Sequence, residues 1–485
     1  MSQACTVVVL GASGDLAKKK TFPALFSLYT NKNLPASCRI VGYARSDFTD
    51  DSFHERIKPQ LKGTPEEIAG FLRICSYHQG SYDNDADFRK LDAELRKAEE
   101  QHTQPATRIF YMALPPSVFA TVAEHLRHNC YIDGGKNRII VEKPFGHDLA
   151  SSRALITRMK SLWSEEETYR IDHYLGKEMV KNIPTFRFCN PIIENMLNST
   201  YVDSVQISFK EPFGTEGRGG YFDEFGIIRD IQQNHLCQVF SLLAMDQPAD
   251  FSAEAVRDAK VDILKQVEPV RADEVLIGQY VAANGKAGYK DDETVPRDSR
   301  TPTFAAIVLR INNDRWRGVP FILKAGKALD EGKVEIRIQF KEAHMSIPGA
   351  ARDELVMRIQ PGEAAYIKVN TRLPGVGSTA APVELDLTYA SRFRDMHIPE
   401  AYEALILDAL REDHSNFVRD DELLASWAIF TPVLHAIDRG EVPVAQYPFG
   451  SRGPEEVDEF MKRLGYRRSE RYEWPKANVQ ELSKV

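Results

Sequence analysis

The chain has 485 residues, of which 43% are hydrophobic and 27% are charged. This length is about three times that of an ordinary domain, so we expect two or more domains, or one domain with a large insertion. The composition excludes collagen-like, coiled-coil and wholly disordered chains. With 62 Lys and Arg against 70 Asp and Glu, the net charge of -8 argues against a nucleic-acid-binding protein and a polybasic membrane-surface protein.

Cysteine usage and the N-terminal sequence bear on the compartment. The six cysteines are scattered and never form a C-x-x-C pair, which argues against a zinc site or a disulfide framework and favours a reducing compartment. They are Cys5, Cys38, Cys75, Cys130, Cys189 and Cys237. No apolar run approaches the roughly 18 residues of a membrane span, and the first residues lack a signal-peptide pattern. We expect a cytoplasmic protein without a metal or a membrane contact.

Strand and helix patterns alternate over the first 170 residues. A β-branched strand at 6–10 (TVVVL) is followed by a helical pattern at 15–29 and by a second strand at 39–43. The alternation continues with a strand at 108–112, a helix at 116–128 and a strand at 138–141. Such β-α-β units predict a parallel sheet.

Beyond residue 170 strand patterns predominate, which is typical of a largely antiparallel sheet. Strands are expected at 201–210, 303–311, 334–340, 354–359, 365–369 and 383–389. Helical patterns at 230–244, 399–411 and 421–439 are expected to cover one face of this sheet, and 284–302 and 374–382 are expected to be loops. We therefore predict an α/β plus α+β fold. It has an N-terminal Rossmann-like parallel-sheet domain at 1–172 and a larger α+β domain at 173–485, with a mostly antiparallel sheet covered by helices.

A glycine-rich turn follows the first strand. Gly11, Ala12, Ser13 and Gly14 lead directly into a helical pattern, so backbone N–H groups and the positive end of a helix can bind a pyrophosphate there. The match to G-x-G-x-x-G is imperfect, because Ser13 stands in place of the second glycine and Ala17 where the third would then fall. By itself the turn is equally consistent with an ordinary strand-to-helix connection.

The end of the second strand sharpens this interpretation. Sites for NAD usually carry Asp or Glu there, whereas this chain has Arg45 and Ser46. A guanidinium and a hydroxyl suit a 2′-phosphate, so NADP is favoured over NAD. The alternative is that Arg45 is a solvated loop residue.

Two later segments concentrate chemistry-bearing residues. Residues 170–181 read RIDHYLGKEMVK, and residues 209–235 form a glycine-rich stretch that ends in IIRDIQQNH. Histidines with nearby acids can supply a general base and its orienting carboxylate, and lysines can hold a phosphate. The competing interpretation is that these histidines are structural.

These and other motifs closely resemble those of the glucose-6-phosphate dehydrogenase family. The resemblance covers nearly the whole chain. It is carried by GASGDLAKKK (11–20), VGYARS (41–46), ALPP (113–116), EKPFG (142–146), RIDHYLGKE (170–178), FKEPFGTEGRGG (209–220), GKAL (326–329), FVRDDELLASW (417–427) and YPFGSRGP (447–454).

The resemblance implies hydride transfer from C1 of β-D-glucose 6-phosphate to NADP. The product is 6-phospho-D-glucono-1,5-lactone, in the first step of the oxidative pentose phosphate pathway. By resemblance His235 is the general base, Asp172 orients it and stabilises its imidazolium, and Lys143 contacts both substrate and cofactor. The resemblance also implies a homodimer or homotetramer, with the second domain serving substrate binding and dimerisation.

The resemblance assigns the other site residues to three ligands. For NADP they are Gly11, Ala12, Ser13, Gly14, Asp15, Leu16, Ala17, Lys18, Arg45, Ser46, Ala113 and Lys143. For the sugar phosphate they are Lys20, Lys143, His173, Tyr174, Lys177, Glu211, Asp230 and Lys327. A possible second, structural NADP would contact Lys333, Arg337, Arg358, Tyr366, Lys368, Asp386, Tyr447 and Trp474. Gly332 departs from the family, which has an arginine there; Lys333 is expected to compensate in part.

Each assignment has a simpler rival. Lys143 can be a surface lysine at a strand end, Glu211 a turn acid, Asp230 a helix N-cap and Asp172 a partner of Arg170. At the level of function, the alternatives are an oxidoreductase for an unphosphorylated sugar and a nucleotide-sensing module that binds NADP without turnover.

Overall fold

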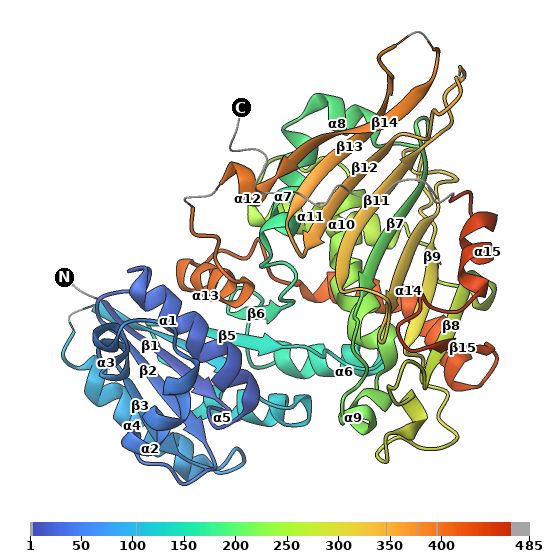
Figure 1. Ribbon diagram of the computed structural model, residues 1–485. Helices are drawn as coiled ribbons and strands as arrows, with labels where there is room; N and C mark the ends of the chain where they lie inside the picture. Colours follow the sequence, from blue (N-terminus) through green and yellow to red (C-terminus); the bar gives the residue numbers. More distant parts are fainter. Residues whose placement is uncertain (1–2, 103, 346, 376, 394–395, 467–485) are drawn as a thin grey trace.

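A computed structural model describes residues 3–102, 104–345, 347–375, 377–393 and 396–466. The chain forms two sheets of different size (Figure 1). In Figure 1 the N-terminal sheet lies at the lower left and the larger sheet at the upper right, with the segment after residue 171 running between them.

The first sheet has six parallel strands in the order β3-β2-β1-β4-β5-β6. They are β1 (Gln3–Leu10), β2 (Cys38–Ala44), β3 (Cys75–Gln79), β4 (Gln104–Met112), β5 (Lys136–Glu142) and β6 (Thr168–Ile171). The strand order reverses between β1 and β4, and ligands of doubly wound sheets bind beyond the carboxyl ends of the strands at this point. The predicted Rossmann-like sheet is confirmed, although β3 and β6 were not among the predicted strands.

Helices cover both faces of this sheet. Val7 and Val9 of β1 join one buried cluster, and Val8 and Leu10 join the other, because successive side chains of a strand point to opposite faces. The covering helices are α1 (Phe22–Thr30), α2 (Asp50–Ile57), α3 (Pro65–Leu72), α4 (Asp85–Glu99), α5 (Phe119–Asn129) and α6 (Leu149–Lys160).

One helix from the second half of the chain also covers the first sheet. The pattern at 399–411 was expected to cover the antiparallel sheet, but α13 (Ala401–Arg411) packs on α1, so that expectation is wrong. Leu405 and Ile406 belong to the same buried cluster as Val9. Arg138 of β5 donates to the carbonyl of Ala409 at 2.8 Å, which satisfies an otherwise unpaired end of the helix. A helical pattern in the sequence shows that the helix has an apolar face, but it does not show which sheet that face packs against.

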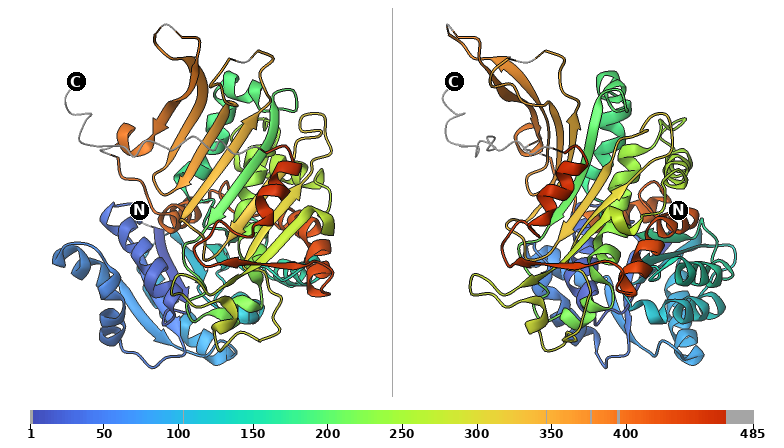
Figure 2. Two further views of the ribbon diagram at one scale, coloured as in Figure 1. Left: turned by 45° about the vertical axis from the view of Figure 1, so that its right-hand side comes forward. Right: turned by 90° about the vertical axis from the view of Figure 1, so that its right-hand side faces the viewer.

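The second sheet has nine strands in the order β14-β13-β12-β11-β7-β10-β9-β8-β15. Neighbours are antiparallel except β7 with β10 and β8 with β15, so the predicted mostly antiparallel sheet is confirmed. The strands are β7 (Val202–Lys210), β8 (Val275–Val281), β9 (Phe304–Leu309), β10 (Phe321–Gly326), β11 (Lys333–Phe340), β12 (Glu354–Gln360), β13 (Ala364–Arg372), β14 (Ala380–Thr388) and β15 (Val444–Pro448). Figure 2 shows the β13–β14 end extending beyond the helices.

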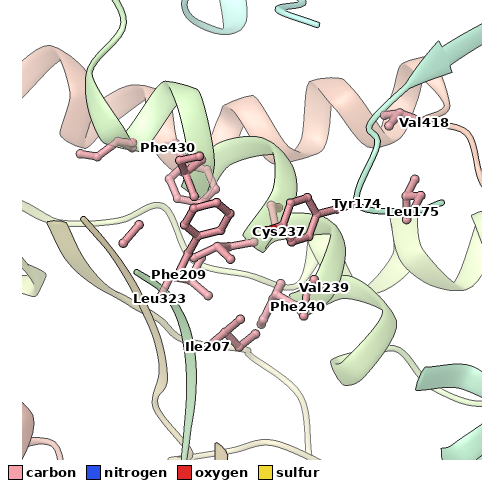
Figure 3. Close-up of a cluster of buried hydrophobic side chains, with 14 of the residues drawn as sticks. Tyr174, Leu175, Ile207, Phe209, Cys237, Val239, Phe240, Leu323, Val418 and Phe430 are labelled. Atoms are coloured by element: carbon pink, nitrogen blue, oxygen red, sulfur yellow. The ribbon is translucent and has the colours of Figure 1, made fainter. Parts of the chain in front are cut away.

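Most helices of the second half are gathered on one face of this sheet, whereas α15 lies on the opposite face (Figures 1 and 2). They are α7 (Glu178–Phe188), α8 (Pro191–Met196), α9 (Gly219–Asp223), α10 (Cys237–Ala244), α11 (Ala253–Lys265), α12 (Tyr389–Arg392), α14 (Asp420–Asp438) and α15 (Glu456–Arg463). Figure 3 shows Cys237 and Phe240 of α10 packed near Ile207 and Phe209 of β7, with Tyr174 alongside. This core fixes α10 and the helical segment that precedes it.

Two further properties concern the whole described chain. Among its helices, none is both long and apolar enough to cross a membrane. All six cysteines carry free thiols, and every one except Cys189 is buried.

Candidate active site

A cleft of about 560 Å³ opens between the two sheets. The first domain contributes Leu16 after the glycine turn and Lys143 after β5. Asp230 and Lys327 enter from the second half, and Tyr402 of α13 lines the cleft as well. The cleft therefore lies at the carboxyl ends of the parallel strands, where doubly wound sheets bind ligands.

A buried histidine–aspartate pair lies beside this cleft. The Nδ1 atom of His235 is 2.5 Å from Oδ1 of Asp172, and both side chains are 2% exposed. The same carboxylate oxygen accepts the backbone N–H of Tyr174 at 2.9 Å. Because a carboxylate can only accept, Nδ1 of His235 carries the proton and Nε2 is left with a free lone pair.

The two pKa values make this pair a base and its carboxylate at neutral pH. Burial would raise the pKa of Asp172, but the attraction and hydrogen bond of His235 bring it to about 2. Burial lowers the pKa of His235 below its usual 6.5, against the opposing effect of Asp172. A neutral imidazole beside an ionised carboxylate is the arrangement that a general base requires.

Two side chains hold the His235 ring in place. The Tyr174 ring stacks on it with centroids 4.5 Å apart, and the His173 ring meets it edge-on at 4.4 Å. Burial lowers the pKa of His173 as well. Among the described residues, the Tyr174 hydroxyl and Oδ2 of Asp172 are buried without a hydrogen-bond partner. Such groups are uncommon in native proteins and mark positions where a polar ligand can bind.

His235 lies on a π-helix, Ile228–Leu236. In a π-helix the backbone bonds join residues five apart, so Asp230 and His235 share one side of the helix. Lys143 donates to the carbonyl of Asp230 at 2.8 Å and to its carboxylate at 3.1 Å. Asp230 lies inside the helix and is not its N-cap, so that rival interpretation is wrong.

The other predicted substrate residues form close pairs. Lys327 donates to Glu211 at 2.6 Å, and Lys177 donates to the side chain of Gln360 at 2.7 Å. Burial lowers the pKa of Lys177, and the nearby charge of Lys20 lowers it further.

Asp172 does not pair with Arg170. That arginine binds Glu165 at 2.8 Å, so the rival interpretation, in which Asp172 serves as the partner of Arg170, is wrong. His173, Tyr174 and Lys177 all follow β6 within one short segment, and of the three only His173 lines the cleft.

The glycine turn has the backbone that the sequence predicts. Gly11 has φ +82°, and a Cβ there would lie 2.2 Å from the carbonyl oxygen of Ala113, so only glycine fits between β1 and β4. The N–H of Gly14 binds the carbonyl of Gly11 at 2.8 Å. A further π-helix, Ala17–Thr21, then carries Lys18 and Lys20.

Arg45 lies exposed after β2 with its guanidinium 5.4 Å from the centroid of the Tyr82 ring. Arg56 of α2 donates to the carbonyl of Ser13 in the glycine turn at 2.5 Å. Neither Tyr82 nor Arg56 was identified from the sequence, because each depends on β3 or α2, whose patterns were not recognised.

Sequence reasoning missed four other residues of the site. Gln360 and Asn234 are uncharged amides without a distinctive motif, and Tyr402 reaches the cleft only because α13 packs on the first domain. Glu142 precedes Lys143 in EKPFG and is fully buried, and its carboxylate accepts the Tyr111 hydroxyl at 2.5 Å. Burial raises the pKa of Glu142 to about 7.

The residues expected around a second NADP are only partly brought together. A polar cavity of about 200 Å³ beside α15 is lined by Lys333, Arg337, Arg358, Tyr366 and Lys368. Arg337 and Lys368 both bind Glu354, at 2.5 and 3.0 Å. Two further lysines of the cavity, the partly buried Lys210 and the buried Lys324, were not predicted.

Two residues of that expected set lie elsewhere. Tyr447 is fully buried and donates to the carbonyl of Lys327 at 2.8 Å, because β15 pairs with β8 at the other end of the sheet. Asp386 is exposed on the edge strand β14 and does not line the cavity. Trp474 lies outside the described residues.

A doubly wound sheet with a nucleotide-type glycine turn, joined by a cleft to a buried histidine–aspartate pair, defines a dinucleotide-dependent oxidoreductase. Two family models match the chain. The model "Glucose-6-phosphate dehydrogenase, NAD binding domain" matches residues 8–182, and "Glucose-6-phosphate dehydrogenase, C-terminal domain" matches residues 184–474. The chain therefore belongs to the glucose-6-phosphate dehydrogenase family.

Individual relatives agree with this family. Glucose-6-phosphate 1-dehydrogenase of Emericella nidulans is 55% identical over 97% of this chain and 94% of the relative. The Saccharomyces cerevisiae enzyme of that name is 50% identical over 97% of this chain and 95% of its own length. A solved glucose-6-phosphate dehydrogenase in complex with glucose 6-phosphate has a TM-score of 0.93 and 49% identity, covering 96% of this chain and 99% of that one.

A more distant likeness concerns the fold alone. A super-repressor mutant of Gal80p from Saccharomyces cerevisiae has a TM-score of 0.54 but only 8% identity. A shared fold does not imply a shared function.

Proposed function

We propose that the chain oxidises D-glucose 6-phosphate at C1 with NADP, giving 6-phospho-D-glucono-1,5-lactone in the first step of the oxidative pentose phosphate pathway. The observation that carries this proposal is the His235–Asp172 pair, buried beside a cleft that also holds Lys143 and Lys327. The relative solved with glucose 6-phosphate, at 49% identity, supports the choice of substrate.

In this proposal His235 is the general base. Its Nε2 lone pair accepts the proton of the C1 hydroxyl, while Nδ1–H remains bonded to Asp172 at 2.5 Å. The imidazolium that forms lies against an ionised carboxylate, which stabilises it as positive charge develops. NADP, when bound, supplies the acceptor of the hydride that leaves C1.

The residues around the glycine turn fit NADP. A Cβ added at Gly14 would meet only the Gly11 carbonyl oxygen within 4 Å, so the space beside the turn is open and a pyrophosphate can approach the backbone and the helix start closely. Arg45 is an exposed cation at the end of β2, where a 2′-phosphate would lie, and Ser46 beside it adds a hydroxyl. Lys143 lines the cleft together with Leu16, which follows this turn, and it binds Asp230, which suits contact with both ligands.

The sugar phosphate is proposed to bind with its phosphate near Lys20, Lys177, His173 and Tyr174. The unpartnered Tyr174 hydroxyl supports this placement, because a phosphate oxygen would satisfy it. Glu211, Asp230 and Lys327 are proposed to bind the sugar hydroxyls; they already carry the hydrogen bonds that those hydroxyls would share.

We also propose that the chain acts as a homodimer or homotetramer in the cytoplasm and binds a second NADP in the cavity beside α15. Arg337, Arg358, Lys368 and Tyr366 supply cations for phosphates and a ring for stacking. Calorimetric titration with NADP is expected to give two sites per chain, and Arg358→Ala is expected to leave one. A single site in the parent protein would contradict this part.

The test of the main proposal is reduction of NADP, followed by absorbance, on mixing with glucose 6-phosphate. Folded protein that gives no signal would refute it. Unphosphorylated glucose in the same assay separates this activity from that of another sugar oxidoreductase. Equilibrium binding of NADP without turnover would instead support a nucleotide-sensing role.

A further inference from the structure

The π-helix Ile228–Leu236 determines which side chains reach the cleft. Residues five apart lie nearly above one another when the backbone bonds span five residues, so Asp230 and His235 both face the reaction centre. In an α-helix the same two residues would point about 140° apart. An α-helical turn at this place would therefore turn one of them away from the side of the helix where Asp230 lines the cleft and His235 meets Asp172.

Two glutamines anchor this helix to the elements that surround it. Gln232 donates to the carbonyls of Ala305 and Leu323 at 3.0 and 2.9 Å, on strands β9 and β10. Gln233 donates to the hydroxyl of Ser426 on α14 at 2.7 Å. These contacts attach the helix to the sheet and to α14, but they do not involve the backbone of the turn that carries the base.

Asn234 contacts that backbone directly. Its amide nitrogen donates to the carbonyl of Arg229 at 3.1 Å, and its Oδ1 atom accepts the backbone N–H of His235 at 2.6 Å. The carbonyl of Asp230, the five-back partner of His235 in the helix, accepts Lys143 at 2.8 Å. The Asn234 amide thus binds both a backbone carbonyl and a backbone N–H of the π-helical turn. The neighbouring carbonyl of Asp230 is the one that accepts Lys143.

From this arrangement we infer that Asn234 is a positioning residue that holds the π-helical turn, so that the His235 base and Asp230 face the substrate together. The inference rests on the proposed role of His235. A side chain of the same size without the amide would leave the Arg229 carbonyl and the His235 N–H to the competing α-helical bonds. Asn234 therefore acts through His235, not on the substrate.

The test is a double-mutant cycle between Asn234→Leu and His235→Asn. Asn234→Leu is expected to lower kcat by about 100-fold, approaching the loss caused by removal of a base. The KM for glucose 6-phosphate and the affinity for NADP are expected to change by less than about threefold. Because both substitutions remove the same function, the double variant is expected to be no slower than His235→Asn alone.

Asn234→Asp keeps an acceptor for the His235 N–H and adds a carboxylate nearby. It is expected to retain more activity than Asn234→Leu, with the acid limb of kcat/KM moved to higher pH, because a nearby negative charge raises a histidine pKa. Asn195→Leu, at an exposed helical asparagine on α8, is the matched control and is expected to keep the parent kcat. Circular dichroism and NADP binding verify that each variant is folded.

The outcomes separate this inference from the proposed function. A parent-like kcat in Asn234→Leu, or losses that multiply in the double variant, would overturn the positioning role and leave the base intact. If Asn234→Leu does not fold, an unshifted acid limb in Asn234→Asp would overturn it. A parent-like kcat in His235→Asn would instead refute the proposed role of His235 as the base.

Discussion

Replacing Asp172 by asparagine tests how the buried pair generates the base. The substitution keeps the size of the side chain but removes a negative charge whose Oδ1 atom lies 2.5 Å from Nδ1 of His235. For charges about 4 Å apart at an effective dielectric constant of about 20, the lost attraction to the imidazolium is about 4 kcal/mol. Since each 1.36 kcal/mol is about a tenfold change in rate, kcat is expected to fall about 10³-fold.

The pH profile gives the sign of the effect. Burial lowers the pKa of His235 below 6.5, and Asp172 is the neighbour that most strongly raises it. In Asp172→Asn the acid limb of kcat/KM should therefore move to lower pH, while the plateau rate falls. Initial rates of NADP reduction from pH 4.5 to 9 measure both changes. An acid limb that moves to higher pH, or a plateau within about threefold of the parent, would contradict this account of the base.

Three further substitutions probe other parts of the site. Arg45→Ala is expected to lower the kcat/KM ratio for NADP over NAD by about 10–100-fold, because one charge-assisted contact is lost; parallel assays with both cofactors measure it. Lys177→Met is expected to raise the KM for glucose 6-phosphate with little change in kcat, as steady-state kinetics would detect. Glu142 has a folded pKa of about 7 against the usual 4.5, so stability falls as the pH rises between these values. Glu142→Gln should remove about 3 kcal/mol of this dependence in urea unfolding at pH 4.5 and 7.5.

The strands that the sequence predicted are those with runs of β-branched and aromatic residues. Residues 6–10 and 39–43 became the cores of β1 and β2 for this reason. The edge strand β3 reads CSYHQ and was missed, because half-exposed strands carry little apolar signal. The short strand β15 lies far from its partner β8 in the sequence, so only the folded chain shows their pairing.

Local motifs predicted more of the site than periodicity did. The segment after β6 is continuous, so the same few residues bring His173 to the cleft and Asp172 and Tyr174 against the His235 ring. The turn that presents His235 could not be foreseen, because a 3.6-residue period does not distinguish a π-helix from an α-helix. Tyr447 was expected at the second cofactor cavity from the family resemblance, but the register of β15 takes it to the Lys327 carbonyl instead.

The acidic net charge does not conflict with two phosphorylated ligands, because the lysines in and near the cleft are held by partners of the chain itself. Lys143 binds Asp230, Lys327 binds Glu211, and Lys177 binds the neutral amide of Gln360. Unpaired buried charges would destabilise the fold, and these pairs avoid that cost while fixing each ammonium group. When a ligand enters such a cleft, its oxygens replace the side-chain oxygens as partners of the lysine ammonium groups. The lysines therefore need little reorganisation. Local pairing therefore accounts for anion binding in a protein whose average charge is negative.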